Sequence, residues 1–286
     1  MQHGPAVRRR KLGAELRALR VSAGLTSGGA ARLAGWHQSK VSRIETGTSG
    51  AKPADVRLLL DVYGVADPQL RELLLVLSGS GDGDGRHHWW HAYRGVLPPT
   101  YRDFISLESQ ASAMRTLETT VIPGLLQTPE YARAVTEAAL EGASEERLDA
   151  LVEVRLARQD VLRATPPLEL SAVLDEAVLR REVGGPGVMR RQLGRLVEAA
   201  RLPQVRLQVL PFSAGAHIGV TGPFVIFSFS RTSDLDVVVL DHLTSSLHLE
   251  RKEDLRAYSE AFDVLSIHAL SPEDSLDFIA GAAAGA

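Results

Sequence analysis

The chain has 286 residues, of which 44% are hydrophobic and 23% charged, a composition typical of a globular protein of about two domains. It contains no cysteine, which excludes disulfide frameworks, thiolate nucleophiles and cysteine-ligated metal sites. The net charge of −3 is the sum of two unlike parts. Residues 1–78, which we call the head, have twelve Lys/Arg against six Asp/Glu and a net charge of +6, whereas residues 79–286, the body, have twenty against twenty-nine and a net charge of −9. Only the head is therefore expected to meet a polyanion.

The sequence pattern of the head predicts helices throughout. Leu12, Leu16 and Leu19 give one apolar face over residues 8–22, and Ala23-Gly24 ends that helix. Four more helices are predicted: a short one marked by Leu25, Ala30, Leu33 and Ala34, one marked by Val41 and Ile44 that ends at Gly47, one over 54–63 opened by Pro53, and one from Pro68 through Leu77. The head is therefore predicted to be an all-α domain of five helices.

The second and third of these helices have the residues needed for a sharp turn between them. Counting from Ser27, the small Ala31 lies where the helices cross, and Gly35 occupies the turn, where a positive φ is required. Apolar Val41 and Ile44 direct one side of the third helix inward. The outward positions are polar: Gln38, Ser39, Lys40, Ser42 and Arg43. A helix with such a face fits the major groove of B-DNA, with its N-terminal residues near the base edges.

The head resembles the phage-repressor (Xre) class of helix-turn-helix proteins. The motifs that carry the resemblance are Leu12-Gly13-x-x-Leu16-x-x-Leu19-Arg20, Ala23-Gly24-Leu25-Thr26 and Gln38-Ser39-Lys40-Val41-Ser42-Arg43-Ile44-Glu45-x-Gly47. The resemblance implies that Gln38, Ser39 and Arg43 read bases. It also implies that Thr26 and Ser27 lie near the phosphate backbone, at a helix N-terminus where free N–H groups favour an anion.

Roles in DNA contact, helix shape and packing are expected for further residues of the head. Arg9, Arg10, Lys40 and Ser42 are expected to contact the DNA backbone, although the run Arg8–Lys11 is equally compatible with a solvated tail. Gly28-Gly29 departs from the family pattern and predicts a short or irregular second helix, because each glycine costs ~1 kcal/mol there. Glu45 is expected to neutralise positive charge or hydrogen-bond within the domain, and Trp36 to pack at the turn rather than to contact the backbone.

Residues 79–87 are predicted to be a flexible linker, because Ser78–Gly85 is composed of small and polar residues that bury no apolar surface. Residues 88–286 are predicted to form an α+β domain with four strands and five or six helices. The strands are expected over 168–174, 205–210, 224–229 and 237–240, and the helices from Pro129 to Leu140, from Ser144 to Arg163, over 186–201 and 253–268, and from Ser271.

The body resembles the C-terminal domain attached to Xre heads in actinobacterial antitoxin-like transcriptional regulators. The segments that carry the resemblance are Trp89-Trp90, 121–128, Tyr131-Ala132, 174–180, 209–217, Gly222-Pro223-Phe224 and Leu249-Glu250. The resemblance implies a small partner protein encoded nearby.

Two groups of residues in the body are open to more than one interpretation. Asp175 and Glu176, with Arg180 one turn later, fit helix capping and an ion pair, or a site for a ligand or partner. Phe212 and His217 belong to a loop after a strand, where His217 fits either a turn cap or a binding role. His87, His88 and His91 suggest a metal, but the segment fits an aromatic anchor better, because no further ligands are evident.

The sequence predicts a DNA-binding transcription regulator, dimeric and cytoplasmic, and nucleoid-associated when bound to DNA. No nucleophile triad, P-loop or metalloprotease motif is present, so an enzyme and a cofactor are not expected. No run approaches ~18 consecutive apolar residues, so no membrane span is expected, and the basic N-terminus lacks the apolar run of a signal peptide. The body is expected to bind a small protein or a ligand; the alternative is an antitoxin-like protein that sequesters a partner and binds DNA for autoregulation.

Overall fold

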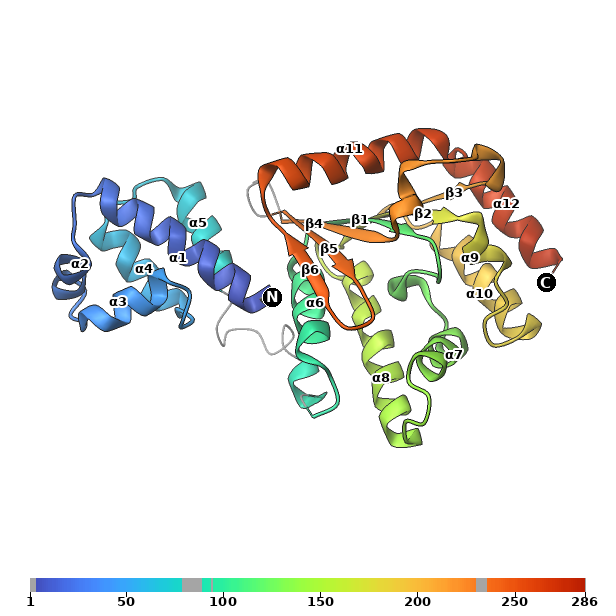
Figure 1. Ribbon diagram of the computed structural model, residues 1–286, viewed down its shortest axis with the longest axis horizontal. Coiled ribbons are helices and arrows are strands. Elements are labelled where there is room, and N and C mark those ends of the chain that lie inside the picture. Colours follow the sequence, from blue (N-terminus) through green and yellow to red (C-terminus); the bar gives the residue numbers. More distant parts are fainter. Residues whose placement is uncertain (1–3, 79–88, 94, 230–235, 286) are drawn as a thin grey trace. The chain divides into compact units, whose positions relative to one another are not determined.

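The computed structural model describes residues 4–78, 89–93, 95–229 and 236–285, and it divides into two compact units, Met1–Trp89 and Trp90–Ala286 (Figure 1). The first unit is all-α and the second contains helices and a six-stranded mixed sheet, which confirms the predicted fold class. The predicted linker, 79–87, lies outside the described residues. No helix in the described ranges is long and apolar enough to cross a membrane.

The first unit contains the five predicted helices. They are α1 (Gly4–Ser22), α2 (Ser27–Leu33), α3 (Gln38–Glu45), α4 (Pro53–Val62) and α5 (Pro68–Leu77). The expected shortness of α2 is confirmed, since it has seven residues. Thr26 caps this helix, and the Gly29 N–H donates to Thr26 Oγ1 at 3.0 Å.

Gly13 allows α1 to pack directly on the end of α3. A Cβ at this position would stand 2.5 Å from the carbonyl oxygen of Ile44 and 2.6 Å from that of Glu45, which no side chain tolerates. Leu12 and Leu16 flank the contact and are fully buried, together with Ile44. The Leu12-Gly13 pair of the sequence motif is therefore a close-packing device that fixes the angle between α1 and α3.

The sheet of the second unit has the order β3-β2-β1-β4-β5-β6. The strands β1, β2 and β3 run parallel, and each of the pairs β1/β4, β4/β5 and β5/β6 is antiparallel. The bounds are β1 (Ala113–Glu118), β2 (Glu169–Asp175), β3 (Val205–Leu210), β4 (Phe224–Ser228), β5 (Val237–Asp241) and β6 (Ser246–Leu249). Because β5 runs parallel to β1, the carboxyl ends of β1, β2, β3 and β5 share one edge of the sheet.

The prediction of four strands is wrong, since six are described. The missing central strand is β1, whose sequence Ala-Met-Arg-Thr-Leu-Glu has charged residues on both faces. Arg115 is accommodated because its guanidinium donates to Ser259 Oγ at 3.0 Å on a covering helix. The missing edge strand is β6, which is only four residues long.

Seven α-helices are described around the sheet: α6 (Pro99–Gln110), α7 (Pro129–Ala139), α8 (Glu145–Ala157), α9 (Glu176–Arg180), α10 (Pro186–Ala199), α11 (Lys252–His268) and α12 (Pro272–Ala284). The predicted helix from Ser144 to Arg163 is instead α8 followed by a 3-10 helix, Arg158–Arg163. The sequence did not predict α6.

Helices cover both faces of the sheet, with α11 on one face and α6 and α8 on the other (Figure 1). On the α11 face, Phe262 and Leu265 pack against Leu117, Phe224 and Val238 in one buried cluster. On the opposite face, the rings of Phe104 and Phe227 meet edge to face with centroids 5.2 Å apart. Helix α12 covers the edge strand β3, where Ser275 Oγ accepts from the Val209 N–H.

Candidate functional site

Helix α3 has one buried side and one exposed polar side. Val41 and Ile44 have exposed fractions of 0% and 2%, and they fix α3 against the rest of the unit. The predicted base-reading residues Gln38, Ser39 and Arg43 are all exposed, as is Ser42. The packing thus leaves outward the polar face that sequence reasoning expected.

The N-terminal ends of α2 and α3 are joined by side chains. Gln38 Nε2 donates to Ser27 Oγ at 3.1 Å, and Gln38 lies over Gly28, where a Cβ would be 3.9 Å from the Gln38 amide carbon. This bond holds the Gln38 side chain at the start of α3 and uses one of its amide hydrogens. The Thr26 hydroxyl oxygen is occupied by capping α2.

Lys40 is engaged within the unit. Its Nζ lies 2.8 Å from Asp55 Oδ1 and 3.7 Å from the centroid of a Trp36 ring. Trp36, expected to pack at the turn, therefore forms a cation–π contact that holds the ammonium group beside α4. A phosphate would have to compete with Asp55 for Lys40. Arg9 and Arg10 lie in α1, but their side chains are outside the described part of the chain.

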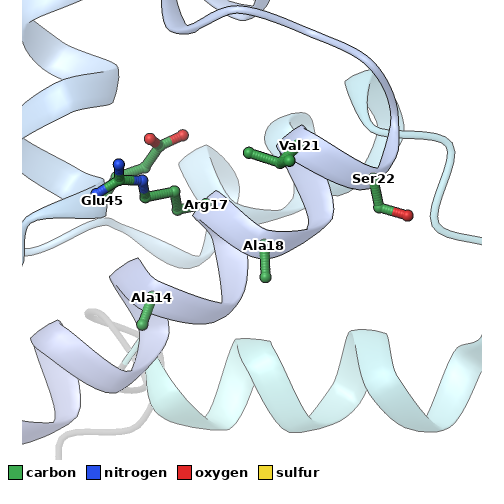
Figure 2. Close-up of a pocket in the computed structure, with 6 residues that line it drawn as sticks. All are labelled: Ala14, Arg17, Ala18, Val21, Ser22 and Glu45. Carbon is green, nitrogen blue, oxygen red and sulfur yellow. The ribbon is translucent and has the colours of Figure 1, made fainter.

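Glu45 pairs with Arg20 in the interior of the first unit. Arg20 Nε and Nη2 donate to the two carboxylate oxygens at 2.7 and 2.9 Å, and Nη1 donates to the Leu25 carbonyl at 2.7 Å. Burial and the charge of Glu45 raise the pKa of Tyr63 well above its usual range. Figure 2 shows Glu45 with the α1 residues that line a hollow of about 580 Å³. The expectation that Glu45 hydrogen-bonds within the domain is confirmed.

The five residues singled out in the body come together at the carboxyl edge of the sheet. Asp175 Oδ1 accepts from the Ala177 N–H and caps α9, and Glu176 pairs with Arg180, with Nε and Oε1 3.1 Å apart. The other oxygen of Glu176 accepts from the Phe212 N–H at 2.9 Å. His217 Nδ1 accepts from the Gly219 N–H, and its Nε2 is 3.7 Å from Asp175 Oδ2. Asp175, Glu176 and His217 therefore make the helix-capping, turn-capping and ion-pair contacts that one of the two interpretations of these residues expected.

The same bonds hold a loop with an apolar outer surface. Phe212, Ile218 and Val220 have exposed fractions of 60%, 52% and 76%, and we call them the apolar loop residues. Gly219 faces inward, because a Cβ there would lie 2.6 Å from Leu117 Cδ2. The loop therefore presents its large side chains outward from a backbone fixed to α9 and β1.

A metal at His87, His88 and His91 was the less favoured interpretation of that segment, and His87, His88 and the side chain of His91 lie outside the described residues. Within the described ranges, no group of three or more His, Asp or Glu side chains is placed to hold a metal ion.

Side-chain amides satisfy the backbone of the segment 121–128, which links β1 to α7. Gln192 Nε2 donates to the Leu126 carbonyl and its Oε1 accepts from the Thr128 N–H, at 2.8 and 2.7 Å. Gln127 Nε2 donates to the Ile122 carbonyl and Gln159 Nε2 to the Gln127 carbonyl, both at 2.7 Å. The segment quoted in the family resemblance contains a 3-10 helix, Gly124–Leu126, and its backbone is held by buried side-chain amides.

Sequence reasoning missed the carboxyl group of Glu118, at the end of β1. It faces the hydroxyl of Thr116, the guanidinium groups of Arg155 and Arg158, and the carboxylate of Asp241. Burial, with a contribution from Asp241, raises the pKa of Glu118 to about 8, despite the opposing effects of Thr116 and the two arginines. The sequence offered no signal for this residue, because the strand that ends with it was not predicted.

The raised pKa predicts how stability depends on pH. Between the ordinary pKa of 4.5 and about 8, the folded protein retains a proton on Glu118 that the unfolded chain releases. The contribution of Glu118 to the free energy of unfolding is therefore expected to decrease as the pH rises through this window. Urea unfolding of the second unit at pH 5, 6, 7 and 8 measures it, and Glu118→Gln should remove this part of the slope. Equal slopes for the variant and the wild type would contradict the prediction.

Two domain families match the chain. A helix-turn-helix domain matches residues 11–74, and a domain of unknown function, DUF5753, matches residues 101–281. No curated protein and no solved structure matches it. The helix-turn-helix match supports a DNA-binding regulator. The chain therefore belongs to the DUF5753 family, and its DUF5753 domain follows a helix-turn-helix domain.

Proposed function

We propose that the protein is a sequence-specific transcription regulator of the phage-repressor (Xre) class, acting in the cytoplasm, in which α3 reads operator DNA from the major groove. The observation that carries the proposal is the two-sided α3, with Val41 and Ile44 buried and Gln38, Ser39 and Arg43 exposed. Each exposed side chain carries donors suited to base edges, and arginine reads guanine with two hydrogen bonds. The net charge of +6 on residues 1–78 supports a polyanionic partner.

Thr26, Ser27, Ser42, Arg9 and Arg10 are proposed as backbone contacts that position α3 without carrying sequence information. Lys40 is also assigned to the backbone. Since the Lys40 ammonium is paired with Asp55, it must exchange one anion for another, and we expect it to add less affinity than an unpaired arginine would.

Replacing Arg43 with alanine tests the assignment of α3. The expected loss is about 1–3 kcal/mol of binding free energy, or roughly a 5- to 150-fold rise in Kd, with relaxed preference at one or two base pairs. Fluorescence anisotropy of the full chain on a duplex selected from a random library, and on its single-base variants, measures both quantities. Arg57→Ala, at an exposed arginine of α4, is the matched control. Equal weakening on every sequence would remove Arg43 from the base-reading residues.

The protein is proposed to bind DNA as a homodimer. Helix α3 has eight residues, and a helix of this length reads only a few base pairs, so one copy supplies little specificity. Sedimentation of the free protein and of its complex with a two-half-site duplex tests the proposal. A monomer in both samples would overturn it.

The second unit is proposed to bind a small protein partner, or a ligand, that controls the regulator. The apolar loop residues support the proposal, because a rigidly held apolar surface loses little entropy when a partner covers it. Isolation of the full chain under native conditions, with Phe212→Ser as the comparison, shows whether a small protein is retained through this loop. A retained protein that is toxic when produced alone would instead favour the antitoxin-like role, with DNA binding serving autoregulation.

A further inference from the structure

A cavity of about 370 Å³ lies between the start of α6 and the hairpin that joins β5 to β6 (Figure 1). Its volume falls in the range of small-molecule sites, roughly 300–1,000 Å³. The segment at the start of α6 contributes Thr100, Tyr101 and Phe104, and the hairpin contributes residues 241–246. The cavity is thus at the carboxyl end of β5, on the edge of the sheet where α/β proteins bind their ligands.

Asp241 gives this cavity a negative charge. Among the described residues that line the cavity, there is no other carboxylate and no lysine or arginine. Asp241 is exposed, and its carboxylate forms no hydrogen bond or ion pair with a described residue. The cavity therefore has an accessible carboxylate that the described part of the chain leaves without a counter-charge.

A second carboxyl group lies on the same face of the sheet. Thr116 and Val239 share one row of the sheet, because both are opposite Val225. Glu118 and Asp241 are each two residues further along parallel strands, so they project from that same face, with their Cα atoms roughly 10 Å apart at two strand spacings. The charge of Asp241 acts on this neighbour, since it contributes to the raised pKa of Glu118.

The two arginines that face this second carboxyl group do not pair with Asp241. Arg158 is paired with Glu108, with Nη2 and Oε2 2.7 Å apart, and Arg155 donates to a side-chain amide oxygen at 3.3 Å. Neither arginine lines the cavity. A bound cation would therefore supply the charge that Asp241 lacks.

The remaining lining suits a cation with an apolar body. The rings of Tyr101 and Phe104 form an apolar wall, and Thr244, Ser245 and Ser246 supply hydroxyl groups. An ammonium group has three hydrogens to donate and no acceptor, so a carboxylate surrounded by hydroxyl oxygens can satisfy it.

We propose that this cavity binds a small organic cation, an ammonium group on an apolar body, with Asp241 as its counter-charge. The site uses none of the apolar loop residues, and it does not depend on the DNA binding proposed above. It assigns the second unit a ligand class in addition to the protein partner considered for its loop.

Three probes of similar shape test the charge selectivity: phenethylamine, phenethyl alcohol and hydrocinnamate. Isothermal titration calorimetry of the full-length chain without DNA should show binding of the amine, and binding of the alcohol and the acid at least about tenfold weaker. Asp241→Asn keeps the shape of the side chain and removes its charge, so it should weaken amine binding by about 10- to 100-fold. Asp277→Asn, at an exposed position of α12 on the opposite edge of the sheet, should leave the affinity unchanged. Both variants should unfold at the wild-type temperature.

A second variant and a spectrum locate the site. Thr244→Lys supplies an ammonium group from the hairpin itself and should prevent amine binding. Amide NMR of the wild type should show shifts in residues 241–246 and at the start of α6 when the amine is added. An amine that does not bind, that binds no more tightly than the alcohol, or that binds Asp241→Asn as well as the wild type would overturn the proposal. Because no DNA is present, none of these results bears on the DNA-binding proposal.

Discussion

Replacing Glu45 with glutamine is expected to lower the free energy of unfolding of the first unit by about 3–5 kcal/mol. The side chains of Arg20 and Glu45 are 10% and 5% exposed, and the guanidinium group of Arg20 cannot lose its proton. Glutamine would therefore leave a buried positive charge without a counter-charge. Urea unfolding of the full chain measures the loss, and hydrogen exchange of the α1 and α3 amides assigns it to this unit.

Two further variants make the Glu45 result interpretable. Glu15→Gln, on the exposed side of α1, removes the same charge and should change the free energy of unfolding by less than about 0.5 kcal/mol. The double variant Arg20→Met, Glu45→Leu should recover most of the loss, because no buried charge remains. A loss below about 1 kcal/mol in the single variant would show that water or another group compensates Arg20.

The Arg20–Glu45 pair also links the stability of the first unit to the proposed reading of DNA by α3. Glu45 ends α3, and Arg20 ties it to α1 and, through the Leu25 carbonyl, to the segment before α2. Gly13 brings α1 against the same turn of α3. The C-terminal end of the proposed reading helix is therefore fixed by α1, while His37 and Gln38 fix its N-terminal end.

The parts of the fold that the sequence predicted are those with a local signal. Val41 and Ile44 in helical register, with Gly35 before them, were sufficient to predict α3 and its exposed face. Strand β1 lacks such a signal, because Arg115 and Glu118 find their partners on distant elements. A residue's partner across the fold determines whether its charge is tolerated in a strand, and no short window of sequence contains that information.

The candidate site shows the same limit. The exposure of Gln38 and Arg43 followed from their helical positions, whereas the engagement of Lys40 depends on Asp55, fifteen residues later, and on a ring contact with Trp36. The capping role of His37 was available from its position before Gln38.

Replacing Glu108 with glutamine is expected to destabilise the second unit by about 3–5 kcal/mol. Arg158 Nε and Nη2 donate to the two oxygens of Glu108 at 2.8 and 2.7 Å, and Nη1 donates to Tyr101 Oη at 2.7 Å. The side chains of Arg158 and Glu108 are 6% and 1% exposed. This pair joins α6 to the 3-10 helix after α8, so its loss should raise hydrogen exchange in both elements.

Substituting the other partner of the pair, in Arg158→Met, should lower the free energy of unfolding by less than Glu108→Gln does. The difference between the two variants is the decisive part of the test. The Glu108 carboxylate that Arg158→Met leaves behind can take up a proton, whereas the guanidinium group that Glu108→Gln leaves behind cannot lose one. The Arg158→Met variant should therefore regain stability relative to the wild type as the pH falls from 7 to 5, and Glu108→Gln should not. Glu130→Gln removes a half-exposed partner of Arg191 and, as the control, should cost less than about 1 kcal/mol. Equal losses for both variants at pH 5 and pH 7 would mean that packing, rather than an unpaired charge, determines the cost.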